Sequence, residues 1–321
     1  MASQSKNGKA FEYITLKKIY DALSENQEIE IIEDSSYRIA KYAFEYEITD
    51  SLRENQIRAS ELAIEVILDF EPQLGSPDLG TEPLSLSIQS DNQGQRGDVR
   101  DVICLRSSNN WEIGISCKNN HRAVKHSRLS DTIDFGKSWF GYPCSDQYWD
   151  EVLPIFQSLR TIRDESNGEA KWRDLEDKES RIYEPVLQAF ISEMNRLNER
   201  YPDIGERLTR YLIGENDFYK VITNMRSQEV SVEMYNLNGT LNLSTSSRNS
   251  RSRAHRTLPA SDILRVDWYE GRRNTVEMIC DRGWQFNMRI HNASSRIEPS
   301  LKFDIQLTSA PNTVTTRDHA W

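Results

Sequence analysis

The sequence predicts a mixed α/β (α+β) fold, in which helices flank a mixed sheet and a β-rich region follows in the C-terminal third. Three observations support this prediction. Several segments before residue 210 have the 3.6-residue periodicity of amphipathic helices. Between residues 97 and 121, two runs of β-branched and apolar residues flank a turn-forming stretch, which predicts a β-hairpin. The last third alternates between strand-like runs and polar loops, so we expect two regions, 1–210 and 211–321.

The composition narrows the class of protein. Of the 321 residues, 37% are hydrophobic and 28% are charged, and no apolar run is long enough to cross a membrane. We therefore expect a cytoplasmic protein without a signal peptide or membrane segment. The four cysteines lack CxxC spacing, which indicates neither a zinc site nor a disulfide framework. A net charge of −10 argues against a general nucleic-acid coat protein, but it allows a cleft with local positive charge.

The N-terminal half is expected to be mainly helical. Apolar residues recur at helical spacing in segments 11–23 and 36–48. A longer helix of about five turns is expected over residues 51–70, where Pro72 helps to end it. Pro185 is expected to mark the true start of one later helix, because proline suits the first helical turn. The later helices are expected at 150–163, 179–200 and 206–213.

The predicted hairpin brings two charged side chains together. If the turn centres between Ser108 and Asn109, antiparallel pairing places Asp101 opposite Ser116. Lys118 then lies diagonally across from Asp101 on the same face of the sheet. The hairpin therefore predicts a carboxylate and an ammonium group side by side where the first strand begins.

Such a pair suits the hydrolysis of a phosphodiester. This reaction needs a divalent metal with hard oxygen ligands, and Asp101 can supply one. A lysine beside the metal can stabilise the developing charge or position the attacking water, which suits Lys118. Cys117 can offer its backbone carbonyl to the same metal, since its side chain points to the other face. An aspartate and a lysine at strand ends also occur without any such role, so a purely structural pair is the alternative.

The stretch after the hairpin reverses the sign of the charge. No acidic residue occurs between Ile113 and Ser130, although the chain as a whole is acidic. Contacts to DNA phosphates need such a patch, whereas a solvated basic loop is the alternative reading. The candidate DNA-binding residues here are Asn120, His121, Arg122, Lys125, His126 and Arg128.

Four segments in this part of the chain carry a resemblance to a known family: 97–101, 112–121, 123–130 and 133–140. They are similar to the HaeIII family of type II restriction endonucleases, which implies a fold of the PD-(D/E)XK nuclease kind. The match is densest over residues 95–150, and the chain length agrees with a family member over its whole extent. The resemblance implies Mg²⁺-dependent cleavage of double-stranded DNA at GGCC with blunt ends. Composition and spacing alone indicate no target sequence.

One departure from the PD-(D/E)XK motif leaves its metal site incomplete. The motif expects an acid two residues before the lysine, where this sequence has Ser116. Glu112 faces the right way but lies six residues from Lys118, or roughly 20 Å of strand, too far to share one metal. Our candidate for the missing metal ligand and catalytic acid is Glu65, because a carboxylate inside an apolar helical run is costly unless it is paired or metal-bound. Asp98 is the second candidate.

Glu65 also has a plainer interpretation. Glu61 and Asp69 lie one helical turn to either side of it, so the three acids can form a solvated stripe on the helix surface.

The C-terminal third is expected to recognise DNA. Its strands are predicted at 219–224, 230–235, 263–269, 275–280, 284–291 and 301–308. Residues 244–256 contain four arginines and no acid, a composition too polar to fold alone. Arg248, Arg251 and Arg253 are expected to contact DNA, since arginine is the commonest reader of guanine in the major groove. An ordinary solvated loop is the alternative.

Two classes of function follow. The first is a sequence-specific endonuclease, which a palindromic target would favour as a two-fold homodimer. The second is a DNA-binding protein without catalysis, because Ser116 leaves the carboxylate set incomplete. A nuclease of the same fold with another target, and a metal-independent nuclease that uses His121 or His126, are further alternatives.

Overall fold

A computed structural model describes residues 3–76, 82–90, 98–119, 123–243 and 253–321. The chain divides into two compact units. The first unit comprises residues 1–121, 214–257 and 312–321, and the second comprises 122–213 and 258–311. These units differ from the two consecutive regions expected from the sequence, because the chain leaves the first unit after residue 121 and returns to it at residue 214. No helix among the described residues is long and apolar enough to cross a membrane.

The first unit contains a mixed seven-stranded sheet with the order β1-β2-β3-β4-β6-β7-β12. The pairs β1·β2 and β4·β6 are parallel, and the others are antiparallel. Parallel neighbours need a crossover connection, and here the chain between β4 and β6 includes residues 122–213 of the second unit. The strands are β1 (Ile29–Ile31), β2 (Leu84–Ile88), β3 (Val102–Arg106), β4 (Trp111–Asn119), β6 (Phe218–Asn224), β7 (Glu229–Tyr235) and β12 (Thr315–Ala320).

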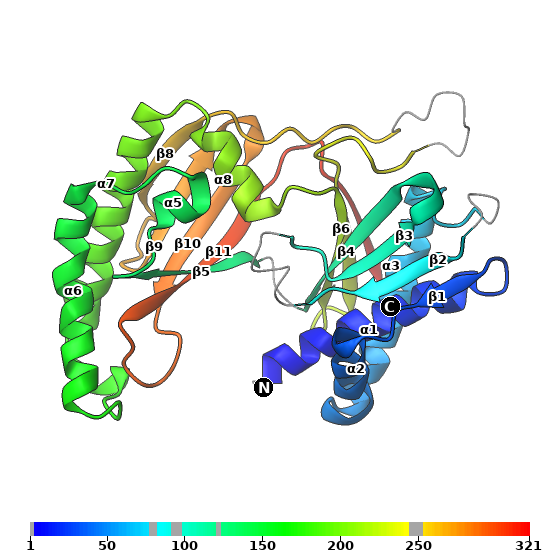
Figure 1. Ribbon diagram of the computed structural model, residues 1–321, viewed down its shortest axis with the longest axis horizontal. Coiled ribbons are helices and arrows are strands. Elements are labelled where there is room, and N and C mark those ends of the chain that lie inside the picture. The colour runs from blue at the N-terminus through cyan, green and yellow to red at the C-terminus, as the bar shows by residue number, and fades with distance from the viewer. Residues whose placement is uncertain (1–2, 77–81, 91–97, 120–122, 244–252) are drawn as a thin grey trace. The chain divides into compact units, whose positions relative to one another are not determined.

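Three helices pack against this sheet: α1 (Ser3–Leu23), α2 (Ser35–Tyr42), which continues as a π-helical turn (Ala43–Glu47), and α3 (Asp50–Phe70). Thr49 caps α3 by accepting a hydrogen bond from the Leu52 amide, as expected for a threonine at that position. In Figure 1 these helices are the blue ribbons beside the cyan strands. Apolar residues of α1 and α3 form one core with the sheet, which places α1 against the hairpin strands.

The second unit contains a five-stranded antiparallel sheet with the order β5-β11-β10-β9-β8. Its strands are β5 (Ala123–Ser130), β8 (Ile263–Trp268), β9 (Thr275–Cys280), β10 (Gln285–His291) and β11 (Ser300–Ser309). Its helices are α5 (Phe135–Phe140), α6 (Asp146–Glu165), α7 (Glu184–Arg200) and α8 (Ile204–Ile213), with a π-helical turn before α7 (Glu179–Tyr183) and short 3₁₀ turns at Trp172–Asp174 and Asp281–Gly283. Pro185 lies in the first turn of α7, as predicted.

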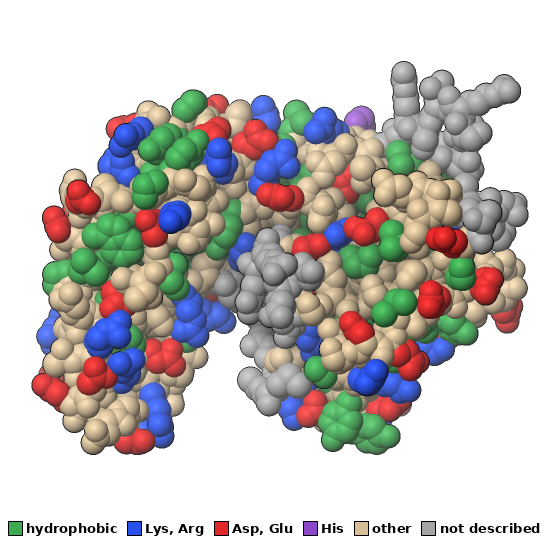
Figure 2. All heavy atoms as spheres, viewed as in Figure 1, with side chains coloured by type: hydrophobic (Ala, Val, Ile, Leu, Met, Phe, Trp, Pro, Cys, Tyr) green, Lys and Arg blue, Asp and Glu red, His purple; other side chains and the backbone are tan. Residues whose placement is uncertain are grey.

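The fold class is confirmed, since helices flank two sheets and strands dominate the C-terminal third (Figure 1). The predicted hairpin is also confirmed: Val102 pairs with Ile115, which sets Asp101 opposite Ser116. The alternative of a basic loop after the hairpin does not hold for residues 123–130, which form the edge strand β5. Figure 2 shows acidic and basic side chains interspersed over the face in view.

Candidate active site

Asp101 and Lys118 meet at the end of the β3–β4 hairpin. The Lys118 Nζ atom donates a hydrogen bond to Asp101 Oδ2 over 3.2 Å. The side chains are 28% and 23% exposed, so solvent or a ligand can reach both. The pair that the sequence predicted is therefore formed and accessible.

Backbone contacts fix the position of Asp101. Its amide donates to the Ile115 carbonyl over 2.8 Å, which extends the hairpin ladder one residue beyond β3. The Cys117 amide and the Ser116 hydroxyl donate to Asp101 Oδ2 over 2.6 and 3.3 Å. Within the described part of the chain, all side-chain hydrogen bonds of Asp101 end on Oδ2. Among the described residues, the other carboxylate oxygen, Oδ1, accepts none of these hydrogen bonds.

Glu12 on α1 is a buried acidic residue that the sequence analysis did not single out. It is only 7% exposed, and its Oε2 atom accepts a hydrogen bond from Lys9 Nζ over 3.0 Å. Burial raises the pKa of Glu12 to about 8, and the negative charge of Asp101 adds to this rise, while Lys9 and Lys118 oppose it. Asp101 and Lys118 both act on the pKa of Glu12, so the charges of these three residues influence one another.

Lys118 keeps its charge in this site. Burial alone would lower the pKa of its ammonium group, but the charge of Asp101 and the hydrogen bond between them outweigh that effect and raise the pKa. A lysine held in this way remains a cation at neutral pH.

Cys117 contributes its backbone rather than its thiol. The thiol is buried and lies 3.6 Å from the Thr15 hydroxyl on α1. Burial raises the pKa of the Cys117 thiol well above its usual value, so the thiol stays protonated. The Cys117 amide points at Asp101, and the amide and carbonyl of one strand residue point to the same side. Its carbonyl therefore faces the Asp101 side of β4.

The structure does not bring Glu65 to this pair. It lies exposed on α3, while Ser60, Ala63 and Ile67 of the same helix are buried. Glu61 and Asp69 are exposed as well, which agrees with a solvated acidic stripe. No hydrogen bond or ion pair in the described structure joins Glu65 to Asp101 or Lys118.

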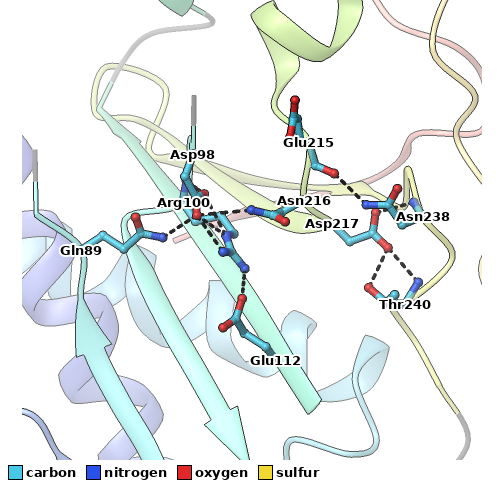
Figure 3. A network of polar contacts seen from close by, with 9 residues as sticks. All are labelled: Gln89, Asp98, Arg100, Glu112, Glu215, Asn216, Asp217, Asn238 and Thr240. Carbon is cyan, nitrogen blue, oxygen red and sulfur yellow. Dashed lines mark hydrogen bonds and ion pairs between the residues drawn. The ribbon is translucent and has the colours of Figure 1, made fainter. Parts of the chain in front are cut away.

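Asp98 is engaged elsewhere. Its carboxylate accepts hydrogen bonds from Arg100, Gln89 and Asn216, and Arg100 also pairs with Glu112 (Figure 3). Burial alone would raise the pKa of Asp98, but the hydrogen bonds from Arg100 and Gln89 lower it. Asp98 is thus a charged partner of Arg100 at neutral pH.

The comparisons with known proteins agree with this site. The family model described as HaeIII restriction endonuclease matches residues 8–311. The chain belongs to the HaeIII restriction endonuclease family. One curated relative, the type II restriction enzyme HaeIII of Haemophilus aegyptius, is 39% identical over 320 residues, which cover 98% of this chain and 97% of the relative. No solved structure matches. As a member of the HaeIII family, the chain is a site-specific deoxyribonuclease that acts on DNA.

The expected DNA-binding residues of this family member fall into two groups. Asn120, His121, Arg122, Arg248 and Arg251 lie outside the described residues. Arg253 is exposed, and its amide donates to the Asn242 carbonyl over 3.0 Å. Three further candidates lie in β5: Lys125, His126 and Arg128.

Two of these candidates on β5, Lys125 and Arg128, differ in how exposed their side chains are. Lys125 Nζ donates to the Tyr211 carbonyl over 3.0 Å and lies 3.5 Å from the centre of the Tyr211 ring, and burial lowers the pKa of its ammonium group to about 8. Lys125 is therefore held inside the second unit. Arg128 is exposed and contacts Glu298 and Ser300, so its side chain is more open to a ligand than that of Lys125, which is partly buried.

A sequence signal for Glu12 did exist. Glu12 lies between Phe11 and Tyr13, both buried, just as Glu65 lies between two apolar residues. The same cost of burying a carboxylate applied to both positions, so sequence alone could not rank them.

Proposed function

We propose that the chain is a Mg²⁺-dependent nuclease of the PD-(D/E)XK kind, with Asp101, Glu12 and Lys118 as its catalytic residues. The observation that supports this most directly is the contact between Lys118 and Asp101 Oδ2 beside the buried acid Glu12. Glu12 takes the role that the sequence had assigned to Glu65, and it supplies the carboxylate missing at Ser116.

The donor set fits magnesium. Among the described residues, no group of three or more His, Cys, Asp or Glu side chains could hold a metal ion. Mg²⁺ does not need such a group, because it is usually bound through one or two carboxylates and keeps several waters. Asp101, Glu12 and the Cys117 carbonyl would provide hard oxygen ligands, the kind that Mg²⁺ prefers. A cation bound there would stabilise charge on the phosphate and make a water more acidic.

The side chains of this chain then have distinct tasks. Asp101 is held by the Cys117 amide, so it offers Oδ1 from a fixed position. Lys118 remains charged and accessible, so it can donate hydrogen bonds to a phosphate oxygen or orient the attacking water. Lys9 Nζ holds Glu12 Oε2 through their hydrogen bond of 3.0 Å.

We infer cleavage at GGCC with blunt ends from the family and from the relative that is 39% identical over nearly the whole chain. A palindromic target of this kind has two-fold symmetry. A homodimer with the same symmetry would place one hairpin at each DNA strand, so we propose that the enzyme acts as a homodimer.

Plasmid digestion tests the proposal. With Mg²⁺, purified protein is expected to cut plasmid DNA into discrete fragments whose ends map to GGCC, and a chelator should stop the reaction. Lys118→Ala and Asp101→Ala should abolish cleavage but leave DNA binding largely intact, because they remove catalytic groups and leave the rest of the DNA-binding surface unchanged.

Other outcomes would contradict parts of the proposal. Retarded but uncut DNA would favour a binding protein without catalysis. Cutting that persists in chelator would favour a metal-independent mechanism, and fragments that end elsewhere would replace the target while keeping the chemistry.

A further inference from the structure

The two faces of the second unit's sheet differ sharply. Along β10, Phe286, Met288 and Ile290 are buried, and they alternate with Asn287, Arg289 and His291. The strand pairing carries this alternation across the sheet: Arg289 lies opposite Asp304 on β11 and opposite Thr275 on β9. One face is therefore apolar. The opposite face, which we call the polar sheet face, presents Arg128, Lys302, Asp304, Gln306, Gln285, Asn287, Arg289, Glu277, Arg265 and Asp267.

An antiparallel sheet often has one solvated face, so polarity alone indicates little. Here the polar sheet face is hollowed. A cavity of about 310 Å³ lies on it, lined among others by Arg272, Asn287, Arg289, Asp304 and Gln306. Several of its side chains are partly buried instead of extended into water, and Asp304 is only 12% exposed. Asn287 Oδ1 is buried and has no hydrogen-bond partner among the described residues. A buried polar atom without a partner is costly, so it indicates a place for a ligand.

The chemistry of this hollow matches base edges. Arginine pairs with guanine O6 and N7, carboxylates accept from the cytosine amino group, and amides pair with adenine. Arg289 and Asp304 lie side by side and offer the first two kinds of contact. Their own contact is long, 3.5 Å, and Arg289 is 55% exposed, so its guanidinium can turn to a ligand. The ten residues that define the polar sheet face include four cations and three acids, whereas the chain as a whole has a net charge of −10.

We propose that the polar sheet face binds duplex DNA, with Arg289 and Asp304 contacting base edges and Lys302 holding phosphate. This inference rests on the proposed function, because it assigns part of the target recognition of that nuclease.

The test measures DNA binding without cleavage. In the Lys118→Ala background, fluorescence anisotropy compares a 20-base-pair duplex that contains one GGCC with a duplex in which that sequence is scrambled. Arg289→Ala should weaken binding to the GGCC duplex roughly 10- to 100-fold and binding to the scrambled duplex much less, because the lost contact reads a base. Arg289→Lys should not restore the preference, since lysine lacks the planar fork.

Two companion variants separate the roles. Lys302→Ala should weaken binding to both duplexes equally and reduce the salt dependence by about one phosphate contact. Arg163→Ala is the matched control, because Arg163 is a partly exposed arginine paired with Asp164 on α6 of the same unit. It should leave both affinities unchanged.

Unchanged binding by Arg289→Ala, in a variant that melts like its parent, would overturn the inference even if the wild-type enzyme cuts DNA. Equal weakening on both duplexes would overturn base reading by Arg289. If the wild-type protein cut no DNA but Arg289→Ala and Lys302→Ala still weakened duplex binding, the proposed function would fail and the polar sheet face would stand as a DNA-binding surface.

Discussion

At the scale of single residues, the burial of Glu12 is the property that would favour its binding a metal ion. A buried carboxylate with a raised pKa is unfavourable in the absence of a cation, and Lys9 offsets only part of that cost. Glu12→Gln removes the charge but keeps the shape. We expect it to lower the cleavage rate by at least about 100-fold and to raise the Mg²⁺ concentration needed for half-maximal activity. Cleavage of a GGCC duplex over a Mg²⁺ titration measures both.

Glu65→Gln is the matched control for that experiment. Glu65 is exposed on α3, so its amide variant should keep near-normal turnover and Mg²⁺ dependence. If Glu65→Gln loses activity and Glu12→Gln keeps it, the assignment of the third acid reverses.

A second buried acid, Glu71, makes the stability depend on pH. Its Oε2 atom accepts hydrogen bonds from the Tyr219 hydroxyl and the Asn242 amide, each over 2.8 Å. Burial raises the pKa of Glu71 to about 7, although these hydrogen bonds oppose the rise. Between the unfolded value of 4.5 and about 7, the folded state binds more protons than the unfolded state. The contribution of Glu71 to the free energy of unfolding therefore falls as the pH rises through this window.

Glu71→Gln should remove that dependence, because glutamine keeps an acceptor oxygen without a titrating proton. We expect the variant to gain up to about 3 kcal/mol relative to wild type between pH 5 and pH 8. Urea denaturation at both pH values measures the difference. A variant whose stability follows the wild-type pH profile would show that Glu71 does not titrate in this range.

At the scale of elements, β4 depends on one glycine. A Cβ atom added at Gly114 would lie 2.1 Å from Cδ and 2.8 Å from Cβ of Arg100. The Arg100 side chain crosses this position to reach Asp98 and Glu112 (Figure 3). Gly114→Ala should therefore destabilise the protein by about 1–3 kcal/mol, measured by urea denaturation.

Gly75→Ala provides the comparison, since the nearest atom to its added Cβ is Leu68 Cδ2 at 3.8 Å, an ordinary contact. It should change the free energy of unfolding little. Equal effects of the two substitutions would mean that Arg100 moves aside at no cost.

The sequence predicted well the elements whose structure depends on residues close together in the chain. The hairpin register follows from the turn at Ser107–Asn109 and Asn110, so Asp101 and Lys118 could be paired without a structure. Strand β5 could not be recognised, because few of its residues are apolar. It is a strand because β11, about 170 residues later, pairs with it and buries Ser127 and Leu129.

At the scale of the whole molecule, the division into units could not be derived from local patterns. The expected boundary at residue 210 is close to the point where the chain returns to the first unit, but β5 and its helices belong to the second unit with β8 to β11. The electrostatic influence of Asp101 and Lys118 on Glu12 was hidden for the same reason, since it depends on the packing of α1 on β4.

The parallel pairing of β4 with β6 has a consequence for synthesis of the enzyme. A ribosome completes β4 at Asn119 but does not reach β6 until Phe218, so for about a hundred residues of translation the strand that carries Lys118 has one bare edge. Truncated or nascent chains that end before Phe218 thus hold Asp101 and Lys118 in an unfinished sheet.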